Sequence, residues 1–287
     1  MAGALGRRAL SECPARAAQV RHTRAMDTAL LVGNALSVLA LMTALWVWSV
    51  VRRDASVGDP WWSMGFLLIT ARSIWVTGVT PGKVALGGAV ALWALRLWAH
   101  LTLRARGKPE DPRYQAFRAR YGAERYWWVS YFQVFLLQGV LMFLIAAPLQ
   151  VACSAAAPDA LRWNDLAGLC LFAAGFFFEA LGDWQLTRFR NDPAMRGRVL
   201  DTGLWRYTRH PNYFGESLMA WGFWLCAYDQ RLGLATVFAP VLMTFLLLNV
   251  SGVTLLEQQL VKSRRGYADY VRRTSPFWPR RPSQRET

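Results

Sequence analysis

Carboxylate and amide side chains recur four residues apart in apolar stretches of the chain. Glu179 and Asp183 form one pair, and Asn212 and Glu216 form another. Residues four apart share one face of a helix. Two carboxylates on one face repel each other unless a cation or hydroxyl groups lie between them. Glu257, in L-L-E-Q-Q-L, has a similar setting. Ionisable groups in apolar helices are costly, so we expect these residues to line a functional pocket.

The polar stretch 188–211, between the two pairs, contains six arginines. Four of them are Arg190, Arg198, Arg206 and Arg209. Arginine donates paired hydrogen bonds to phosphate, and it is also the obvious counterion for the carboxylates. Carboxylates and the Asn212 amide bind hydroxyl groups. A nucleotide cofactor carries both phosphates and hydroxyls, so the sequence predicts a nucleotide site. If the arginines served only to orient the chain in a membrane, the carboxylates would have no explanation.

Two smaller features are open to a plainer interpretation. Arg96 and His100 share a helical face with Trp93. They either form the polar wall of an internal cavity or lie near a helix end, where Arg96 would extend to lipid phosphate. Asn212 follows a proline that suits the first position of a helix, so it could simply belong to a helix start.

Helices long enough to cross a bilayer must position these groups. A spanning helix needs about 20 mostly apolar residues. Seven segments qualify, so we expect an all-α, polytopic integral membrane protein. They are residues 27–51, 60–80, 83–104, 127–151, 164–187, 212–228 and 232–261. An interfacial helix is expected from Pro112 to Tyr121. Residues 26–287 would form one domain with its cofactor half at about 164–280, and residues 1–25 would be a disordered tail or precede a natural start at Met26.

The positive charge of the chain is one-sided. With seven spans, 23 of the 33 Lys and Arg residues fall in the loops and tail of one side, and 3 fall in the opposite loops. The positive-inside rule then places the C-terminus and the pocket in the cytoplasm, and we expect the membrane to be a bacterial inner membrane.

Long apolar runs with 54% hydrophobic residues argue against a nucleic-acid binder. The cysteines form no C-x-x-C pair and the three histidines are scattered, so no metal site is expected.

One segment is more specific than any periodicity. Residues 182–224 include G-D-W-Q-L-T-R-F-R-N-D-P and R-H-P-N-Y-F-G-E. This segment resembles the C-terminal domain of steroid 5α-reductases, and most of all its bacterial branch of membrane proteins, the DUF1295 family. D-A-S-V-G-D-P-W-W at 54–62 and R-G-K-P-E-D-P-R-Y at 106–114 are also similar to that branch. The resemblance covers about residues 50–280.

The resemblance implies a seven-helix membrane reductase. Such an enzyme holds NADPH at the cytoplasmic ends of its later helices and reduces a C=C bond conjugated to a carbonyl in a lipophilic substrate. Asn212 and Glu216 match the family's N-x-x-G-E. With the residues selected above and their neighbours, the predicted cofactor-binding set is Lys108, Glu179, Asp183, Arg190, Arg198, Tyr207, Arg209, His210, Asn212, Tyr213, Glu216 and Glu257.

The proton donor is where this sequence departs from the steroid-reducing members. They polarise the substrate carbonyl with a tyrosine in the third helix and a glutamate in the second. Residues 83–104 contain no tyrosine, and the second span has no carboxylate beyond Asp59 at its start. Asp59 and His100 are therefore the catalytic candidates, since an acid must reach the carbonyl oxygen. Steroid specificity does not carry over.

Two other functions remain open. R-H-P-N-Y-F-G at 209–215 also resembles isoprenylcysteine carboxyl methyltransferases, which bind S-adenosylmethionine. Those enzymes have two adjacent glutamates where this chain has Glu257-Gln258, and their cofactor has no phosphates for the arginines. A non-enzymatic lipid-binding or assembly protein is the third possibility. The expected partners are a lipophilic small molecule and membrane lipid, with no nucleic acid and no obligate protein partner.

Overall fold

The described part of the chain is helical. The computed structural model describes residues 14–154, 160–250 and 266–283, with side chains from residue 28 onward. In these ranges there is no β-strand, and an isolated bridge pairs Thr208 with Ser275. The all-α prediction is therefore confirmed for these residues.

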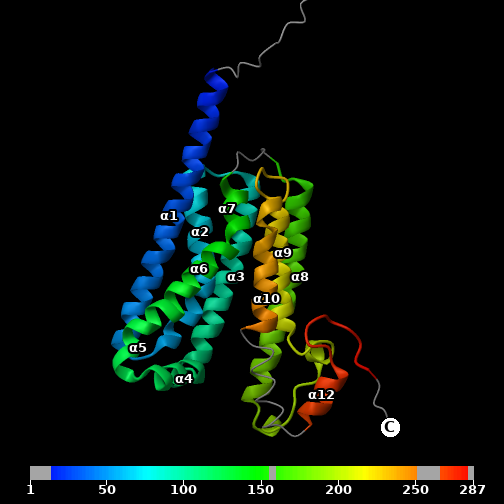
Figure 1. Ribbon diagram of the computed structural model, residues 1–287. Helices are drawn as coiled ribbons and strands as arrows, with labels where there is room; N and C mark the ends of the chain where they lie inside the picture. Colours follow the sequence, from blue (N-terminus) through cyan, green and yellow to red (C-terminus); the bar gives the residue numbers. More distant parts are fainter. Residues whose placement is uncertain (1–13, 155–159, 251–265, 284–287) are drawn as a thin grey trace, which may run out of the picture.

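The helices fall into two groups that lie side by side (Figure 1). The first group comprises α1 (Pro14–Arg52), η1 (Ala55–Trp61), α2 (Trp62–Thr77), α3 (Pro81–Ala105), α4 (Pro112–Tyr121), α5 (Ala123–Ser130), the π-helical turn η2 (Tyr131–Leu136), α6 (Leu137–Ile145) and α7 (Ala147–Ser154). The second comprises α8 (Trp163–Asn191), η3 (Pro193–Met195), η4 (Gly203–Arg206), α9 (Pro211–Ala227), η5 (Leu234–Val237), α10 (Phe238–Asn249) and α12 (Tyr267–Arg273).

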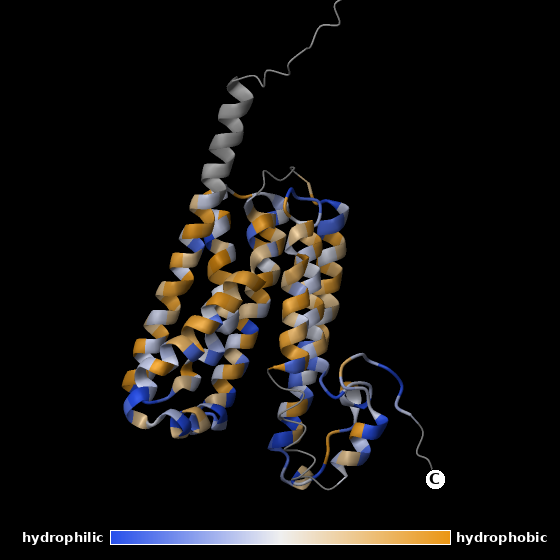
Figure 2. Cartoon of the chain, in the orientation of Figure 1, coloured by the Kyte–Doolittle hydropathy of each residue, from blue (hydrophilic) through white to orange (hydrophobic). Residues whose placement is uncertain are grey.

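Four helical stretches are long and apolar enough to cross a membrane. They are Thr28–Arg52, Pro81–Ala105, Ala123–Ile145 and Trp163–Asn191. Figure 2 shows apolar residues along the middle of the bundle and polar residues gathered at its lower end. We call this lower end, formed by residues 104–126, 188–210 and 266–283, the basic end. The chain is therefore an α-helical membrane protein.

The structure refines several predicted boundaries. The helix expected from Pro112 to Tyr121 is α4 and has the same bounds. The span expected over 127–151 lies at Ala123–Ile145, and a separate helix, α7, starts at Ala147. A proline at position 148 suits the first turn of this new helix, where its missing N–H costs little. The backbone is helical from Pro14; residues 1–13 lie outside the described ranges, and the expectation for residues 1–25 stays a prediction.

Glycines bring α8 and α9 into backbone contact. Gly168, Gly175 and Gly182 recur every seven residues on α8, and Gly215 and Gly222 do so on α9. A Cβ atom on Gly175 would lie 2.5 Å from the Gly215 carbonyl oxygen, and one on Gly168 would lie 2.5 Å from that of Gly222. Small residues let helix backbones approach this closely in membranes. The polar residues at the facing ends of the two helices are thereby held close together.

Candidate functional site

A buried ion-pair centre joins α3 to α8. Arg96 on α3 donates from Nη1 to Glu179 Oε1 over 2.8 Å and from Nη2 to Asp183 Oδ2 over 2.7 Å. The indole N–H of Trp93 donates to the second Glu179 oxygen over 3.1 Å. One guanidinium therefore pairs with both carboxylates predicted to share a face, and Arg96 points into the protein rather than toward lipid phosphate.

The source of this counterion differs from the prediction. The sequence suggested that arginines of 188–211 would neutralise Glu179 and Asp183, but the cation comes from the third helix. Glu179 and Asp183 are 3% and 6% exposed, so their stability in the protein depends on a cation held next to them. Removing one member of a buried pair leaves an uncompensated charge, which is far costlier than losing a surface pair.

Asn212 extends this centre to α9. Its Nδ2 donates to Asp183 Oδ1 over 3.2 Å. Pro211 opens α9, and no side chain caps the helix start. The Asn212 side chain is therefore used for contact with α8 and not for helix-start chemistry. Its Oδ1 is buried and has no hydrogen-bond partner among the described residues.

Glu216 is the third carboxylate of the centre. It lies one turn after Asn212, half-buried, and close enough to Asp183 and Glu179 to interact with both electrostatically. The ring of Tyr213, from the same turn of α9, stacks on His210 with centroids 5.3 Å apart. The structure thus brings Glu179, Asp183, Asn212 and Glu216 together, as the sequence predicted.

His100 lies at the edge of this centre. Its Nε2 is 3.7 Å from Asp183 Oδ2, and the side chain is 20% exposed. His100 is one helical turn beyond Arg96, so both side chains lie next to the Asp183 carboxylate. A histidine beside a carboxylate and still accessible can hold or release a proton.

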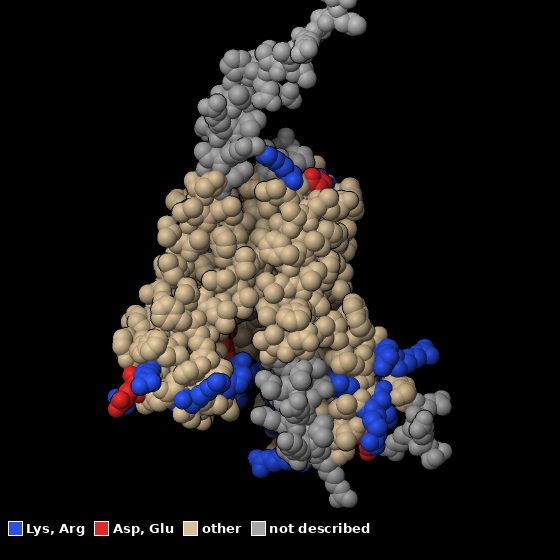
Figure 3. Space-filling view, in the orientation of Figure 1, with Lys and Arg blue, Asp and Glu red and all other residues tan. Residues whose placement is uncertain are grey.

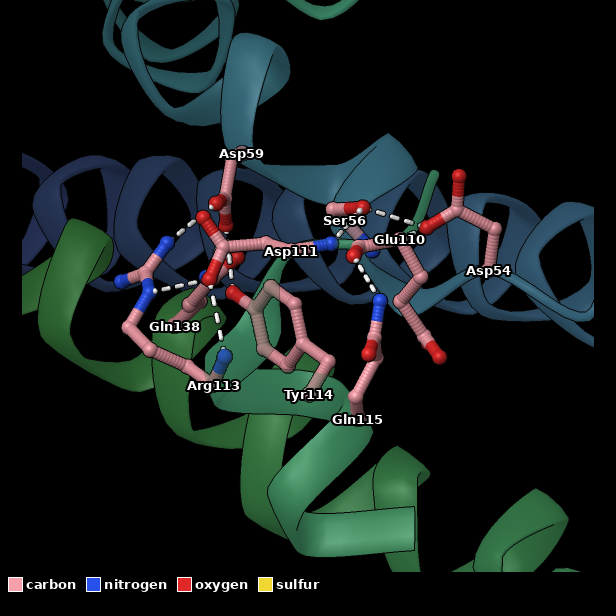
Figure 4. A network of polar contacts seen from close by, with 9 residues as sticks. All are labelled: Asp54, Ser56, Asp59, Glu110, Asp111, Arg113, Tyr114, Gln115 and Gln138. Atoms are coloured by element: carbon pink, nitrogen blue, oxygen red, sulfur yellow. Dashed lines mark hydrogen bonds and ion pairs between the residues drawn. The ribbon is translucent and has the colours of Figure 1, made fainter. Parts of the chain in front are cut away.

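Asp59, the other catalytic candidate, belongs to a different network, shown in Figure 4. Its Oδ2 pairs with Arg113 Nη2 over 2.8 Å. Its Oδ1 accepts from the hydroxyl of Tyr114 over 2.5 Å and from Gln138 Nε2 over 3.4 Å. Burial raises the pKa of the Asp59 carboxyl although Arg113 opposes this, and burial also raises the pKa of Tyr114. No described contact joins Asp59 to His100.

Sequence reasoning missed Tyr114 and Gln138. Tyr114 ends the motif R-G-K-P-E-D-P-R-Y, and Asp59 lies in D-A-S-V-G-D-P-W-W. Both motifs pointed to the same family, and each contains an Asp-Pro step. The presence of both motifs was the signal in the sequence that residues 54–62 and 106–114 could lie in contact. Gln138 had no comparable signal, because it lies in an otherwise apolar helix.

The predicted basic and aromatic residues lie around the basic end. Lys108 is exposed in the loop between α3 and α4, and Arg190 and Arg198 are exposed at and after the end of α8. Tyr207 is exposed, and its carbonyl accepts from the Arg280 amide over 3.1 Å. Figure 3 shows a hollow between the two helix groups at this end, with Lys and Arg side chains along its rim. Glu257 lies outside the described residues.

Arg209 has a structural partner that the sequence did not suggest. Its Nη1 donates to the carbonyls of Val271 and Thr274, over 2.9 and 2.5 Å. Its backbone amide donates to Ser275, and the side chain is 7% exposed. Arg209 therefore fastens the C-terminal segment to the loop before α9. Its expected contact with a cofactor phosphate stays a prediction.

Comparison with known proteins identifies the family. Residues 45–274 match the family model described as "Protein of unknown function (DUF1295)", so the chain belongs to this family. A similar protein is the uncharacterized protein C594.04c of Schizosaccharomyces pombe, 28% identical over 227 residues. The match covers 68% of this chain and 63% of that protein, which is less than two thirds of its length. No solved structure matches.

Proposed function

We propose that this DUF1295 protein is a seven-span membrane reductase that binds NADPH at its basic end and reduces a conjugated C=C bond of a lipophilic enone. The observation that carries the proposal is the buried centre of Arg96, Glu179, Asp183 and Asn212, which lies beside a basic rim. Placing several ionisable side chains inside a membrane protein costs free energy, so such a centre points to a function. A rim of exposed arginines supplies what phosphates require.

The groups at this end fit such a cofactor. Carboxylate and amide oxygens accept hydrogen bonds from ribose and amide groups, and the unpaired Asn212 Oδ1 is one acceptor in place. Lys108, Arg190 and Arg198 would hold the phosphates. When bound, the cofactor would supply a hydride to the β-carbon of the enone. Helices α3, α8 and α9 would exclude water from the reacting atoms.

The chain's own residues would supply the proton. An acid must reach the carbonyl oxygen of the enone as the hydride arrives. His100 is the candidate next to the Asp183 carboxylate. Asp59 is the candidate in the second network, where Tyr114 and Arg113 fix its carboxyl. We infer that one of these two groups acts on the substrate.

Seven spans accommodate the observed helices. The four long stretches are joined by α2, α9 and α10, with 16, 17 and 12 residues. Helices of this length cross a bilayer when the membrane thins locally or flanking residues extend to its surface. This arrangement would place the C-terminus, with the basic end, in the cytoplasm of a bacterial cell.

One observation favours the alternative, an S-adenosylmethionine-dependent methyltransferase. Three carboxylates, Glu179, Asp183 and Glu216, face the single guanidinium of Arg96 within the described centre. A centre with more carboxyl groups than cations suits a cationic ligand, and S-adenosylmethionine carries a sulfonium. The exposed arginines favour NADPH instead, because S-adenosylmethionine has no phosphates for them to bind.

Ligand binding to the purified protein in detergent tests these proposals. Binding of NADPH, weakened by Asn212→Ala and by Glu216→Ala, supports the reductase. Binding of S-adenosylmethionine without NADPH would replace it with the methyltransferase. If neither ligand binds, the non-enzymatic lipid-binding function gains support. Arg72→Lys is a matched control, because this arginine bonds to Leu30 and Asn34 and to none of the residues of the centre.

A further inference from the structure

Arg96, Asp183 and Asn212 form a chain of directed hydrogen bonds across three helices. The guanidinium of Arg96 donates to Asp183 Oδ2, and the other oxygen of that carboxylate, Oδ1, accepts from Asn212 Nδ2. A guanidinium is a rigid planar fork, so the same group also holds Glu179 at 2.8 Å. The position of the Asp183 carboxylate is therefore set from two sides, by α3 and by α9.

This chain of bonds fixes the orientation of the Asn212 amide. The oxygen and nitrogen of an amide are distinguished by their partners, and an ionised carboxylate can only accept. Asn212 must therefore turn Nδ2 toward Asp183. Its Oδ1 is then turned away from Asp183, and this buried atom has no partner among the described residues. A buried acceptor of this kind is costly unless a group donates a hydrogen bond to it, as a bound ligand can.

We propose that Arg96 is a positioning residue that acts through Asp183 to present Asn212 Oδ1 as a fixed acceptor. The ligand group that occupies this position must then donate a hydrogen bond, as an N–H or O–H group. The inference rests on the proposed function for the identity of the ligand. It gives a role to Arg96, which lies on α3 outside the cofactor half of the chain. It also states that the ligand donates, and Asn212 accepts, in one hydrogen bond.

A double-mutant cycle in ligand binding separates positioning from mere stabilisation. Arg96→Lys keeps the charge but loses the fork that holds Asp183 and Glu179 together. We expect it to weaken NADPH binding about tenfold in the otherwise unchanged protein, the cost of one misaligned hydrogen bond at a charged site. In the Asn212→Ala background the same substitution should change binding less than about twofold, because the amide that it orients is gone.

Each outcome decides the proposal. Equal losses in the two backgrounds would show that Arg96 only stabilises the fold, and would overturn the positioning role while leaving NADPH binding intact. If the protein binds S-adenosylmethionine and no NADPH, the cycle is run with that ligand; unequal losses then support positioning although the reductase has failed. Binding of neither ligand overturns both. Arg72→Lys, a second arginine within a helix, should leave binding unchanged in both backgrounds.

Discussion

Arg96 and Asp183, 87 residues apart in the chain, are joined by a 2.7 Å hydrogen bond between Nη2 and Oδ2. This contact ties the first group of helices to the second. Because the same guanidinium also holds Glu179, the stability of the bundle and the geometry of the candidate site depend on one side chain.

Arg96→Gln should destabilise the protein by roughly 3 kcal/mol, because two buried carboxylates would lose their counterion. The measurement is the denaturant-induced unfolding of the purified protein in detergent. Adding Glu179→Gln and Asp183→Asn to Arg96→Gln should restore much of the loss, since the unpaired charges are then removed. An unchanged midpoint for Arg96→Gln alone would show that the ion pairs contribute little.

Gly175→Leu should separate α8 from α9. A side chain at this position would meet the backbone of α9, as its Cβ alone would lie 2.5 Å from Gly215 O. We expect a loss of at least about 2 kcal/mol in unfolding free energy, typical of overpacking, together with loss of ligand binding. Gly88→Leu is the matched control, because a Cβ on this helical glycine meets nothing within 4 Å. Similar losses for both variants would argue against a special role for the helix pair.

Asp59→Asn should alter the pH dependence of stability. Burial raises the pKa of the folded Asp59 carboxyl above its value of about 3.9 in an unfolded chain. Between these values the folded state binds more protons than the unfolded state, so the unfolding free energy falls as pH rises through this window. The variant lacks this fall, so the difference between the unfolding free energies of variant and wild type should grow from pH 4 upward and then level off.

Asp111→Asn gives a control of opposite sign. Burial acts to raise the pKa of Asp111, but hydrogen bonds from Arg113 outweigh it and hold the pKa below its usual range. Asp111 therefore contributes stability that is lost as pH falls below about 3.9. If both variants shift stability in the same direction with pH, the charge assignment of this network is wrong.

A topology map tests the orientation of the chain. Fluorescent protein fused after residue 287 should fold and fluoresce in a bacterial host, because the seven-span arrangement places this end in the cytoplasm. Alkaline phosphatase inserted at residues 155–159 should be active, since this connection would face the opposite side. The reverse pattern would require an inverted chain or an even number of spans.

The sequence predicted some parts of the structure closely. Pro112 and the change in composition after Tyr121 defined α4 to the residue, because proline and glycine mark helix ends locally. The carboxylate pairs on α8 and α9 were evident because a four-residue spacing in an apolar run is itself a helical signal.

Other parts depend on contacts between distant segments. The counterion of Glu179 could have been Arg96 or any arginine of 188–211, because one sequence does not show which helices pack together. The π-helical turn at Tyr131–Leu136 was hidden in a run whose hydropathy suits a regular helix. Arg209 looked like a phosphate ligand, since nothing local reveals that the C-terminal segment returns to its guanidinium.

The pairing of Arg96 with Glu179 also has a consequence for synthesis. The two residues are 83 positions apart, so at typical rates a ribosome adds the carboxylate on the order of ten seconds after the arginine. During this interval α3 carries a cation without its native partner. When α8 inserts, Glu179 pairs with Arg96, and neither the buried cation nor the buried carboxylate is then left without a partner. Insertion of α8 therefore also stabilises α3 in the membrane.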